Sequence, residues 1–320
     1  MIYFMKLIIG KKTDIGCVRE TNEDCYYAEI SQKAGTSSDA FGLLLVADGM
    51  GGQIGGEEAS QTAVYIIKTL YSQNIGDKRS INNIEDFIIS FLKEANRAVL
   101  EKGKSLNGNI GTTLTAALVK NTTAYIGHVG DSRAYIIRDR DIKQLTEDHT
   151  LAEDLIRKGK ATIEEMKNSP MQNMLTRSIG SGEELKIDPP VGVDLKSGDV
   201  LVLCTDGLTN LVEDREIIST IHNTPDVQAA CDKLVDMAKE RGGFDNITVI
   251  AAEFDRLKRI KGLGIRAKTI SIKKRKRSRF LIIGISILTA ILLFIIFLIV
   301  FHSNEFISFE KPPIKREIGK

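Results

Sequence analysis

The chain has 320 residues, of which 42% are hydrophobic and 27% are charged. This length fits one large domain with an appendage, and the composition excludes a chain that is disordered throughout. Residues 1–253 carry 28 Lys or Arg against 38 Asp or Glu, whereas residues 254–279 carry 12 basic side chains and one acid. Because duplex binding depends on Lys and Arg neutralising phosphates, we expect no nucleic-acid partner for the acidic part.

Apolar runs and amphipathic segments alternate over the first 253 residues. Short runs rich in β-branched side chains predict strands, and apolar positions three and four residues apart predict helices. The expected strands are 41–47, 112–119, 123–129, 134–137, 200–204 and 247–252, and the expected helices are 57–71 and 84–100. The Gly-Asp-Ser-Arg sequence after 123–129 predicts a hairpin with 134–137. Residues 151–173 are polar and helical in pattern, and we expect an insertion that lies against the main sheet.

The four cysteines, Cys17, Cys25, Cys204 and Cys231, form no C-x-x-C pair. They are too sparse for a disulfide framework or a structural zinc site. We therefore expect reduced, mostly buried thiols in a reducing compartment.

Residues 280–301 form an uncharged apolar run, long enough for the roughly 20 residues that cross a bilayer core. The run predicts a single transmembrane helix. The basic cluster 273–279 precedes it directly, and basic residues beside a span favour the cytoplasmic side. We expect a cytoplasmic domain at 1–253, a basic linker at 254–279 and a short extracytoplasmic tail at 302–320. A nuclear-localisation or nucleic-acid-binding role for the basic cluster is the alternative, which its adjacency to the span disfavours.

Acidic residues recur at the ends of the predicted strands. Asp48 and Asp206 each end an apolar run and precede a glycine, Asp245 lies just before the last strand, and Asp131 lies in the turn after 123–129. Taken singly, each acid is an ordinary turn or cap residue.

Together with the sequence RETNED at 19–24, however, these acids indicate a common site. Clustered carboxylates repel one another unless a cation neutralises them, and carboxylate oxygens are the ligands that Mg²⁺ and Mn²⁺ prefer. The pattern therefore predicts a bound divalent metal.

Eight motifs resemble, in order, those of the metal-dependent protein phosphatases of the protein phosphatase 2C type, most closely the bacterial branch. They cover roughly residues 8–253. The motifs are RETNED at 19–24, DGMGGQIGGEEAS at 48–60, GTT at 111–113, GDSRAY at 130–135, LTEDHTL at 145–151, LTRSIG at 175–180, LCTDGL at 203–208 and GGFDNITVI at 242–250.

The resemblance implies an α+β fold, a four-layer αββα sandwich of two antiparallel sheets flanked by helices. It also implies a centre of two Mn²⁺ or Mg²⁺ ions. On that template Asp48 bridges both ions, Glu23 and the carbonyl of Gly49 complete one, and Asp206 and Asp245 hold the other.

Further residues take roles from the same resemblance. Asp131, with Asp206, matches a third and weaker ion site, Asp24 orients the attacking water, and Arg19 binds the phosphate. Met50 stands where many eukaryotic relatives have a histidine proposed as the general acid, so His149 is considered as a substitute, against its more common structural role. Residues 151–173 correspond to the mobile flap of bacterial members.

The implied activity is hydrolysis of phosphoserine and phosphothreonine in proteins, reversing a cognate serine/threonine kinase at the membrane. Two alternatives stay open at this point. One is a phosphatase dedicated to a single regulatory protein of a partner-switching system, and the other is a non-catalytic membrane scaffold.

Overall fold

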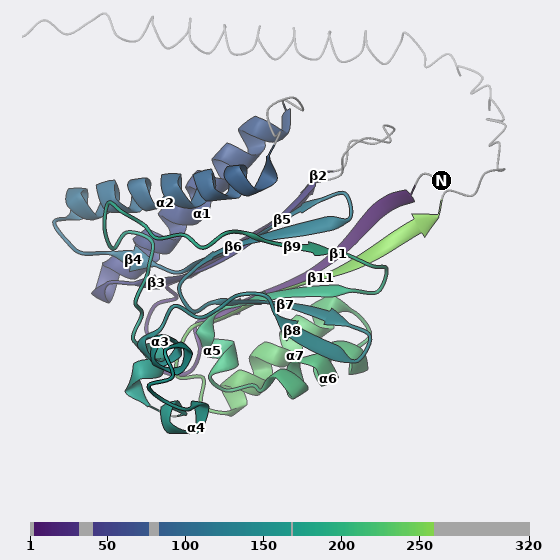
Figure 1. Cartoon of the computed structure of the whole chain (residues 1–320). Coiled ribbons are helices and arrows are strands. Elements are labelled where there is room, and N and C mark those ends of the chain that lie inside the picture. Colours follow the sequence, from purple (N-terminus) through teal and green to yellow (C-terminus); the bar gives the residue numbers. More distant parts are fainter. Residues whose placement is uncertain (1–2, 32–40, 77–82, 168, 259–320) are drawn as a thin grey trace, which may run out of the picture. The chain divides into compact units, whose positions relative to one another are not determined.

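The computed structural model describes residues 3–31, 41–76, 83–167 and 169–258 (Figure 1). They belong to one compact unit, Met1–Arg259. The predicted span 280–301, the tail 302–320 and the linker from residue 259 onward lie outside the described residues. Within the described ranges, no helix combines the length and apolarity needed to cross a membrane.

One sheet of the unit contains five antiparallel strands. Their order is β1 (Tyr3–Asp14), β11 (Ile247–Lys258), β10 (Val200–Cys204), β7 (Arg133–Arg138) and β8 (Asp141–Gln144). The first and last strands pair along their whole lengths, from Tyr3 opposite Lys258 to Asp14 opposite Ile247. The predicted domain boundary at 253 is therefore too early, because residues 254–258 continue the last strand.

The second sheet is also antiparallel. Its main order is β2 (Asp24–Ser31), β3 (Phe41–Met50), β5 (Leu114–Lys120), β6 (Thr123–Val129) and β9 (Val191–Asp194). The two-residue strand β4 (Gly111–Thr112) pairs with the end of β3.

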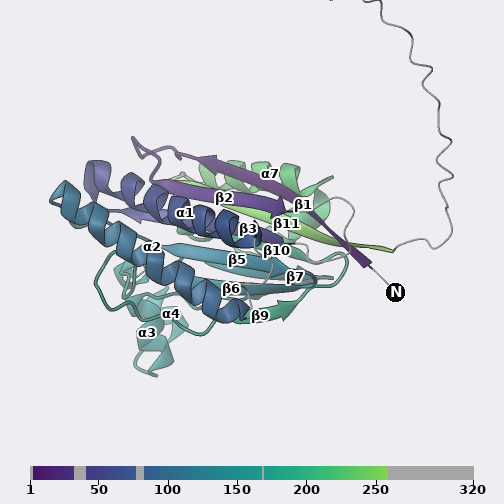
Figure 2. The same ribbon diagram turned by 90° about the horizontal axis from the view of Figure 1, so that it is seen from above.

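Helices cover the outer face of each sheet, as Figures 1 and 2 show. Helices α1 (Gly52–Gly76) and α2 (Ile84–Leu106) pack on the second sheet, and α6 (Asp214–Asn223) and α7 (Val227–Glu240) pack on the first. The short helix α5 (Asp206–Thr209) follows β10 directly. The predicted four-layer αββα sandwich is confirmed.

Strand β3 illustrates why the sequence folds in this way. Leu43 and Leu45 pack into the cluster beneath α1 and α2, whereas Leu44 and Val46 pack into the cluster between the sheets. Successive side chains of a strand point to opposite faces, so a strand that is covered on both faces requires an uninterrupted apolar run. The residue that follows each such strand therefore lies at an end of the sandwich.

Local signals define α2. The side chain of Asn83 accepts from the amides of Glu85 and Asp86, which caps the first turn, and the helix ends at Asn107 with a left-handed φ of 53°. Its buried residues include Ile84, Ile88 and Leu92, at a spacing of four. This spacing forms one apolar stripe that faces the sheet.

The predicted hairpin of 123–129 with 134–137 is wrong. Strand β6 pairs with β5 and β9, whereas β7 pairs with β10 and β8, so the two strands belong to different sheets. The turn between them crosses from one sheet to the other. Gly130 lies there with φ +115°, and a Cβ at this position would lie 2.6 Å from Cβ of Thr113, so glycine is required.

The insertion at 151–173 contains α3 (Leu151–Arg157), α4 (Ile163–Met166) and the 3₁₀ helix η1 (Pro170–Asn173). Its helical character is as predicted, but its position is not. The flap lies toward one end of the sandwich instead of across a sheet face (Figure 1). Ala152 is the buried residue of α3, and α4 and η1 contain no buried residue.

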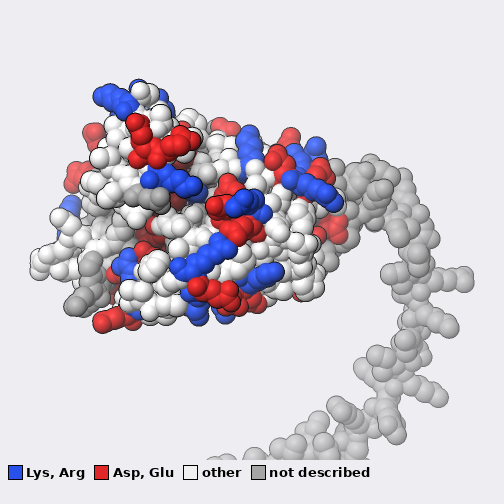
Figure 3. All heavy atoms as spheres, turned by 90° about the horizontal axis from the view of Figure 1, so that it is seen from below, with Lys and Arg blue, Asp and Glu red and all other residues white. Residues whose placement is uncertain are grey.

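The surface of the described domain carries mixed charge. On the face seen in Figure 3, acidic and basic side chains are interspersed over the visible surface. This face does not offer the continuous basic surface that a nucleic-acid duplex requires.

Candidate functional site

A pocket of about 830 Å³ opens at one end of the sandwich. The predicted site residues that line it come from widely separated parts of the sequence. They are Arg19, Glu23, Asp48, Gly49, Asp131, Asp206 and Asp245. Asp24 lies beside the pocket, opposite Asp48 in the pairing of β2 with β3.

Asp48 is held by its main chain. Its amide donates to the hydroxyl of Thr113 at 2.8 Å, and its carbonyl accepts from the Thr113 amide and the Thr112 hydroxyl, each at 2.8 Å. These contacts explain the GTT motif at 111–113. They leave the Asp48 side chain to face the pocket, with its position fixed by the backbone.

Gly49 and Gly56 form a close backbone approach around Glu23. The Gly49 amide donates to the Glu23 carbonyl at 3.1 Å, and the Ser60 hydroxyl donates to the same carbonyl at 2.6 Å. A Cβ at Gly49 would lie 2.1 Å from the Gly56 carbonyl oxygen, and a Cβ at Gly56 would lie 2.6 Å from the Glu23 carboxylate. Only glycine fits at either position.

Asn246 ties the loop that carries Arg19 and Glu23 to the last strand. Its side-chain oxygen accepts from the Glu23 amide at 2.8 Å, and its side-chain nitrogen donates to the carbonyls of Ile15 at 3.0 Å and Thr21 at 2.9 Å. This role of Asn246 was not predicted from the sequence. The available signal was the Asp-Asn pair that opens the strand 247–252.

Arg19 points to the acids. Its Nη2 atom donates to Oδ2 of Asp245 at 2.7 Å, and this hydrogen bond raises the pKa of Arg19. The guanidinium is about half exposed. It therefore presents a permanent positive charge at the mouth of the pocket.

Asp24 accepts hydrogen bonds from two threonines through one carboxylate oxygen. Its Oδ2 accepts from the hydroxyl of Thr205 at 2.9 Å and that of Thr248 at 2.7 Å, whereas Oδ1 is buried without a hydrogen-bond partner. Burial, reinforced by the charges of Asp206 and Asp245, raises the pKa of Asp24 to about 7.

Asp206 and Asp131 complete the acidic group. Asp206 opens α5, its Oδ2 accepts from Asn210 at 3.0 Å, and its Oδ1 is buried without a partner. Burial and the charge of Asp245 raise the pKa of Asp206, while burial and the charge of Asp206 raise the pKa of Asp131 to about 8. Burial and the neighbouring charges of Asp24 and Asp206 also raise the pKa of Asp48 well above its ordinary range.

These residues fit a divalent cation by their chemistry. The acids are hard oxygen donors, and two buried carboxylate oxygens, one of Asp24 and one of Asp206, have no partner. Burial, reinforced by mutual repulsion, raises the pKa of Asp48 and Asp131. Among the described residues, however, no three His, Cys, Asp or Glu side chains converge tightly enough to form a preformed metal-binding group. The case for a cation site therefore rests on the lining of the pocket and on the chemistry of its donors.

The structure places both Met50 and the candidate proton donor His149. Met50 lines the pocket, and its thioether has no proton to donate. His149 is buried, with 4% of its surface exposed, and it does not line the pocket. Burial and the charge of Arg177 lower its pKa. The structure therefore gives His149 the surroundings of a structural histidine.

A second cavity, of about 920 Å³, adjoins the first. It lies between the flap and the segment 206–216, and it shares Asp131, Asn173 and Asp206 with the first pocket. The flap residues Ile156, Ile163 and Met166 give it an apolar wall. The flap thus borders the acidic pocket directly.

Comparison with known proteins agrees with this geometry. Residues 12–247 match the family described as Protein phosphatase 2C. The serine/threonine phosphatase stp of Listeria monocytogenes is 34% identical over 247 residues, which cover 76% of this chain and 94% of the relative.

Solved structures give the same result. The crystal structure of the serine/threonine phosphatase PstP/Ppp of Mycobacterium tuberculosis has a TM-score of 0.69 at 30% identity, and the match covers 78% of this chain and 99% of that one. The catalytic domain of PstP in complex with two manganese ions has a TM-score of 0.67 at 30% identity, covering 79% and 100%.

Proposed function

Because the chain belongs to the protein phosphatase 2C family, we propose that it hydrolyses phosphoserine and phosphothreonine in proteins with the help of two Mn²⁺ or Mg²⁺ ions. It is a protein-serine/threonine phosphatase, a phosphoric monoester hydrolase. One observation carries the proposal. Carboxylates that are far apart in the sequence line one pocket together with the guanidinium of Arg19.

The acids would divide between the two ions. Asp48 would bridge both, Glu23 with the carbonyl of Gly49 would hold one, and Asp206 with Asp245 would hold the other. The unpartnered Asp206 Oδ1 and the raised pKa values of Asp48 and Asp206 support this assignment.

A third and weaker ion would use Asp131 with Asp206. The two acids line both cavities, and the charge of Asp206 contributes to the raised pKa of Asp131. Each therefore gains from a cation placed between them.

When bound, the ions supply a water of lowered pKa and neutralise charge on the phosphate. Arg19 binds phosphate oxygens through its planar guanidinium, for which it must exchange its contact with Asp245. Asp24 orients the attacking water through its free Oδ1. Since Met50 has no proton to give, the leaving alkoxide takes its proton from water or from another side chain.

The membrane location forms a separate part of the proposal. The apolar run 280–301 would anchor the chain as a single span, and the basic residues 273–279 would keep the catalytic domain in the cytoplasm. The anchor would concentrate the phosphatase near a membrane-bound serine/threonine kinase and its phosphorylated targets. No nucleic-acid partner is proposed.

The proposal is tested with the purified full chain and a phosphothreonine peptide, with manganese and with a chelator. Manganese-dependent release of phosphate is expected, and its absence over a range of peptides would contradict the proposal. A small aryl phosphate separates a catalyst from a scaffold. The rates on a phosphorylated regulatory protein and on unrelated phosphopeptides should also be compared. A general enzyme hydrolyses both kinds of substrate, whereas an enzyme dedicated to a single partner hydrolyses only that partner.

A further inference from the structure

His149 contacts the turn that carries Asp131 at two points. Its main-chain amide donates to the Gly130 carbonyl at 2.7 Å, and its ring Nδ1 accepts from the Gly130 amide at 3.1 Å. Both backbone groups of Gly130 are thereby paired with one residue. Because Gly130 directly precedes Asp131, His149 fixes the backbone of the turn next to that acid.

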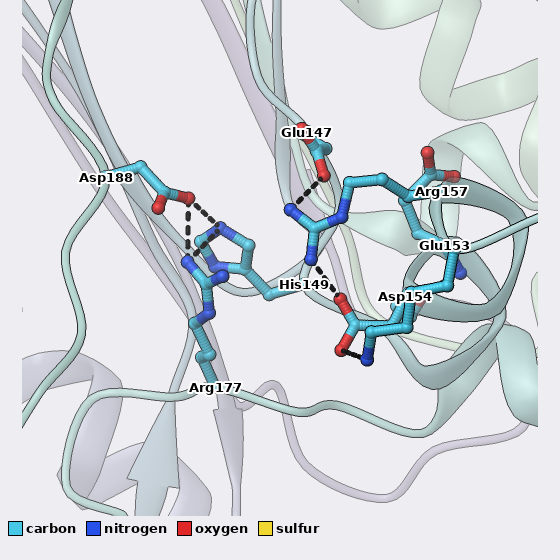
Figure 4. Close-up of polar contacts among 9 residues, drawn as sticks. Glu147, His149, Glu153, Asp154, Arg157, Arg177 and Asp188 are labelled. Atoms are coloured by element: carbon cyan, nitrogen blue, oxygen red, sulfur yellow. Dashed lines mark hydrogen bonds and ion pairs between the residues drawn. The ribbon is translucent and has the colours of Figure 1, made fainter.

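The other side of the ring contacts an ion pair between Arg177, whose side chain is mostly buried, and Asp188, which is half exposed. Nε2 of His149 lies 3.0 Å from Oδ2 of Asp188, and Nη1 of Arg177 donates to the same oxygen at 2.7 Å. Since Nδ1 accepts a hydrogen bond, the neutral ring carries its proton on Nε2 and donates it to Asp188. Figure 4 shows the side chains of Arg177 and His149 meeting at Asp188.

These three residues come from separate segments around the flap. His149 precedes the first flap residue, Arg177 follows the last helix of the flap, and Asp188 lies in the segment before β9, outside the flap. The Arg177 side chain is 12% exposed. A buried guanidinium needs its counter-charge, so Asp188 holds the exit of the flap against the body of the domain.

Backbone contacts join the entrance and exit of the flap at the same place. The amide of Leu151 donates to the carbonyl of Met174, and the amide of Thr176 donates to the carbonyl of His149, each at 2.8 Å. The flap itself contributes little buried apolar surface. Its position therefore depends mainly on this base.

The base is connected to the acidic pocket through Gly130. This glycine lies against Thr113, whose hydroxyl accepts from the amide of Asp48 at 2.8 Å and lies 2.7 Å from the hydroxyl of Ser132. The turn is thus held between Thr113 on one side and His149 on the other. Movement at His149 would be transmitted to Asp131 and to the flap together.

We propose that His149, Arg177 and Asp188 form a positioning unit that locks the base of the flap to the turn carrying Asp131. The unit touches no substrate. It sets the placement of the flap beside the pocket, and so controls the binding of the protein segment around the phosphorylated residue. In this last respect the inference rests on the proposed function.

Arg157 supplies a matched control. It is an arginine of the flap, and it forms ion pairs with Glu147 at 3.0 Å and Asp154 at 2.7 Å, but its side chain is 45% exposed (Figure 4). Arg157→Gln and Arg177→Gln make the same chemical change at an exposed and at a buried site. Exposed pairs contribute little to stability, whereas Arg177→Gln removes a mostly buried guanidinium that contacts both Asp188 and His149.

Hydrogen exchange of the full chain, read by mass spectrometry, tests the lock. In Arg177→Gln and His149→Asn, the amides of 127–132 and 149–176 should exchange about tenfold faster or more, while β10 and β11 stay unchanged. Arg157→Gln should leave all of these amides within about twofold of the wild type. Equal exchange in Arg177→Gln and Arg157→Gln would overturn the proposal.

Asp188→Asn is a second variant that is expected to fold normally, because Asp188 is half exposed and asparagine has nearly the same shape as aspartate. In this variant the flap amides should also exchange faster than in the wild type, and the yield of folded protein should be unchanged. Wild-type exchange in this variant would also overturn the proposal. Since exchange requires no turnover, an inactive wild-type chain would refute the proposed function and leave this test intact.

Kinetics separate positioning from simple loss of folded enzyme. Arg177→Gln should raise KM for a phosphothreonine peptide about fivefold and leave kcat on a small aryl phosphate within about twofold. Equal losses on both substrates would contradict a positioning role.

Discussion

Asp24 lies directly opposite Asp48 where β2 pairs with β3, so two carboxylates share the same end of one sheet. Burial raises the pKa of both, and the charge of Asp24 adds to the effect on Asp48. A fold gains nothing in stability from such a pair. A bound cation would neutralise the two carboxylates, so the pair has a use in binding a metal ion.

Arg19→Ala should raise KM for a phosphothreonine peptide about tenfold or more, because the phosphate loses a charged two-point contact. The manganese concentration for half-maximal activity should change much less. Removing a positive charge that contacts Asp245 at 2.7 Å can only favour a cation there. Initial rates over a grid of peptide and manganese concentrations measure both quantities, and Arg19→Lys is the control that keeps the charge. An unchanged KM in Arg19→Ala would remove the proposed role.

Asn246→Ala should lower the free energy of unfolding by about 2 kcal/mol or more, because a buried side chain loses three hydrogen bonds. It should also reduce kcat/KM, since the loop carrying Arg19 and Glu23 loses its attachment. Urea unfolding and initial rates check the two effects. Asn223→Ala is the matched control, because Asn223 is exposed at the end of α6 and its side chain contacts Ser219. Similar stability of the two variants would show that the Asn246 contacts are unimportant.

We expect the folded protein to lose stability in acid because of His128. Burial lowers its pKa to about 3, and it contacts the hydroxyl of Thr115. A depressed folded-state pKa means that the unfolded chain binds the proton more readily, so stability is retained above about pH 6.5 and lost as the pH falls toward 3.

Between pH 7 and pH 5, His128 alone should lower the free energy of unfolding by about 2 kcal/mol. The measurement is urea unfolding at both pH values for the wild type and for His128→Asn, in the presence of a chelator. The variant should show the smaller change. A change of equal size in both proteins would mean that His128 does not remain neutral in the fold.

A chain ending before Lys273 should remain in the supernatant after membranes are sedimented, whereas the full chain should sediment with them. The apolar run 280–301 is the physical reason. Both chains should hydrolyse an aryl phosphate at similar rates, because the pocket lies within Met1–Arg259. Sedimentation of the shortened chain would place the anchor elsewhere.

The layers and several central strands could be predicted from sequence because they are apolar on both faces, as in β3. Strands β1 and β2 were not predicted. In β1, lysines such as Lys6, Lys11 and Lys12 interrupt the apolar pattern, and this strand lies at the edge of its sheet. Helix α7 was also missed, although its buried residues are spaced as on one helical face, including Ala230, Leu234 and Ala238.

Asp48, Asp206 and Asp245 could be predicted because each lies at an end of an apolar strand. Their supporting contacts could not. Thr113 contacts Asp48 across 65 positions, and Thr205 contacts Asp24 across 181. A threonine or asparagine gives no local signal for a partner that only the fold brings near. The wrong hairpin has a similar cause, since a short polar turn does not reveal that the chain changes sheets there.

The number of manganese ions bound per chain shows whether the acids of the pocket form a two-metal site. Electron paramagnetic resonance of the full chain titrated with Mn²⁺ should report two tightly bound ions per chain for the wild type and fewer than one for Asp48→Asn, whose melting temperature should equal or exceed that of the wild type in chelator. The same variant should lose about a thousandfold or more of its turnover on a phosphothreonine peptide. Equal manganese binding by Asp48→Asn and the wild type, or no binding by the wild type, would contradict the account.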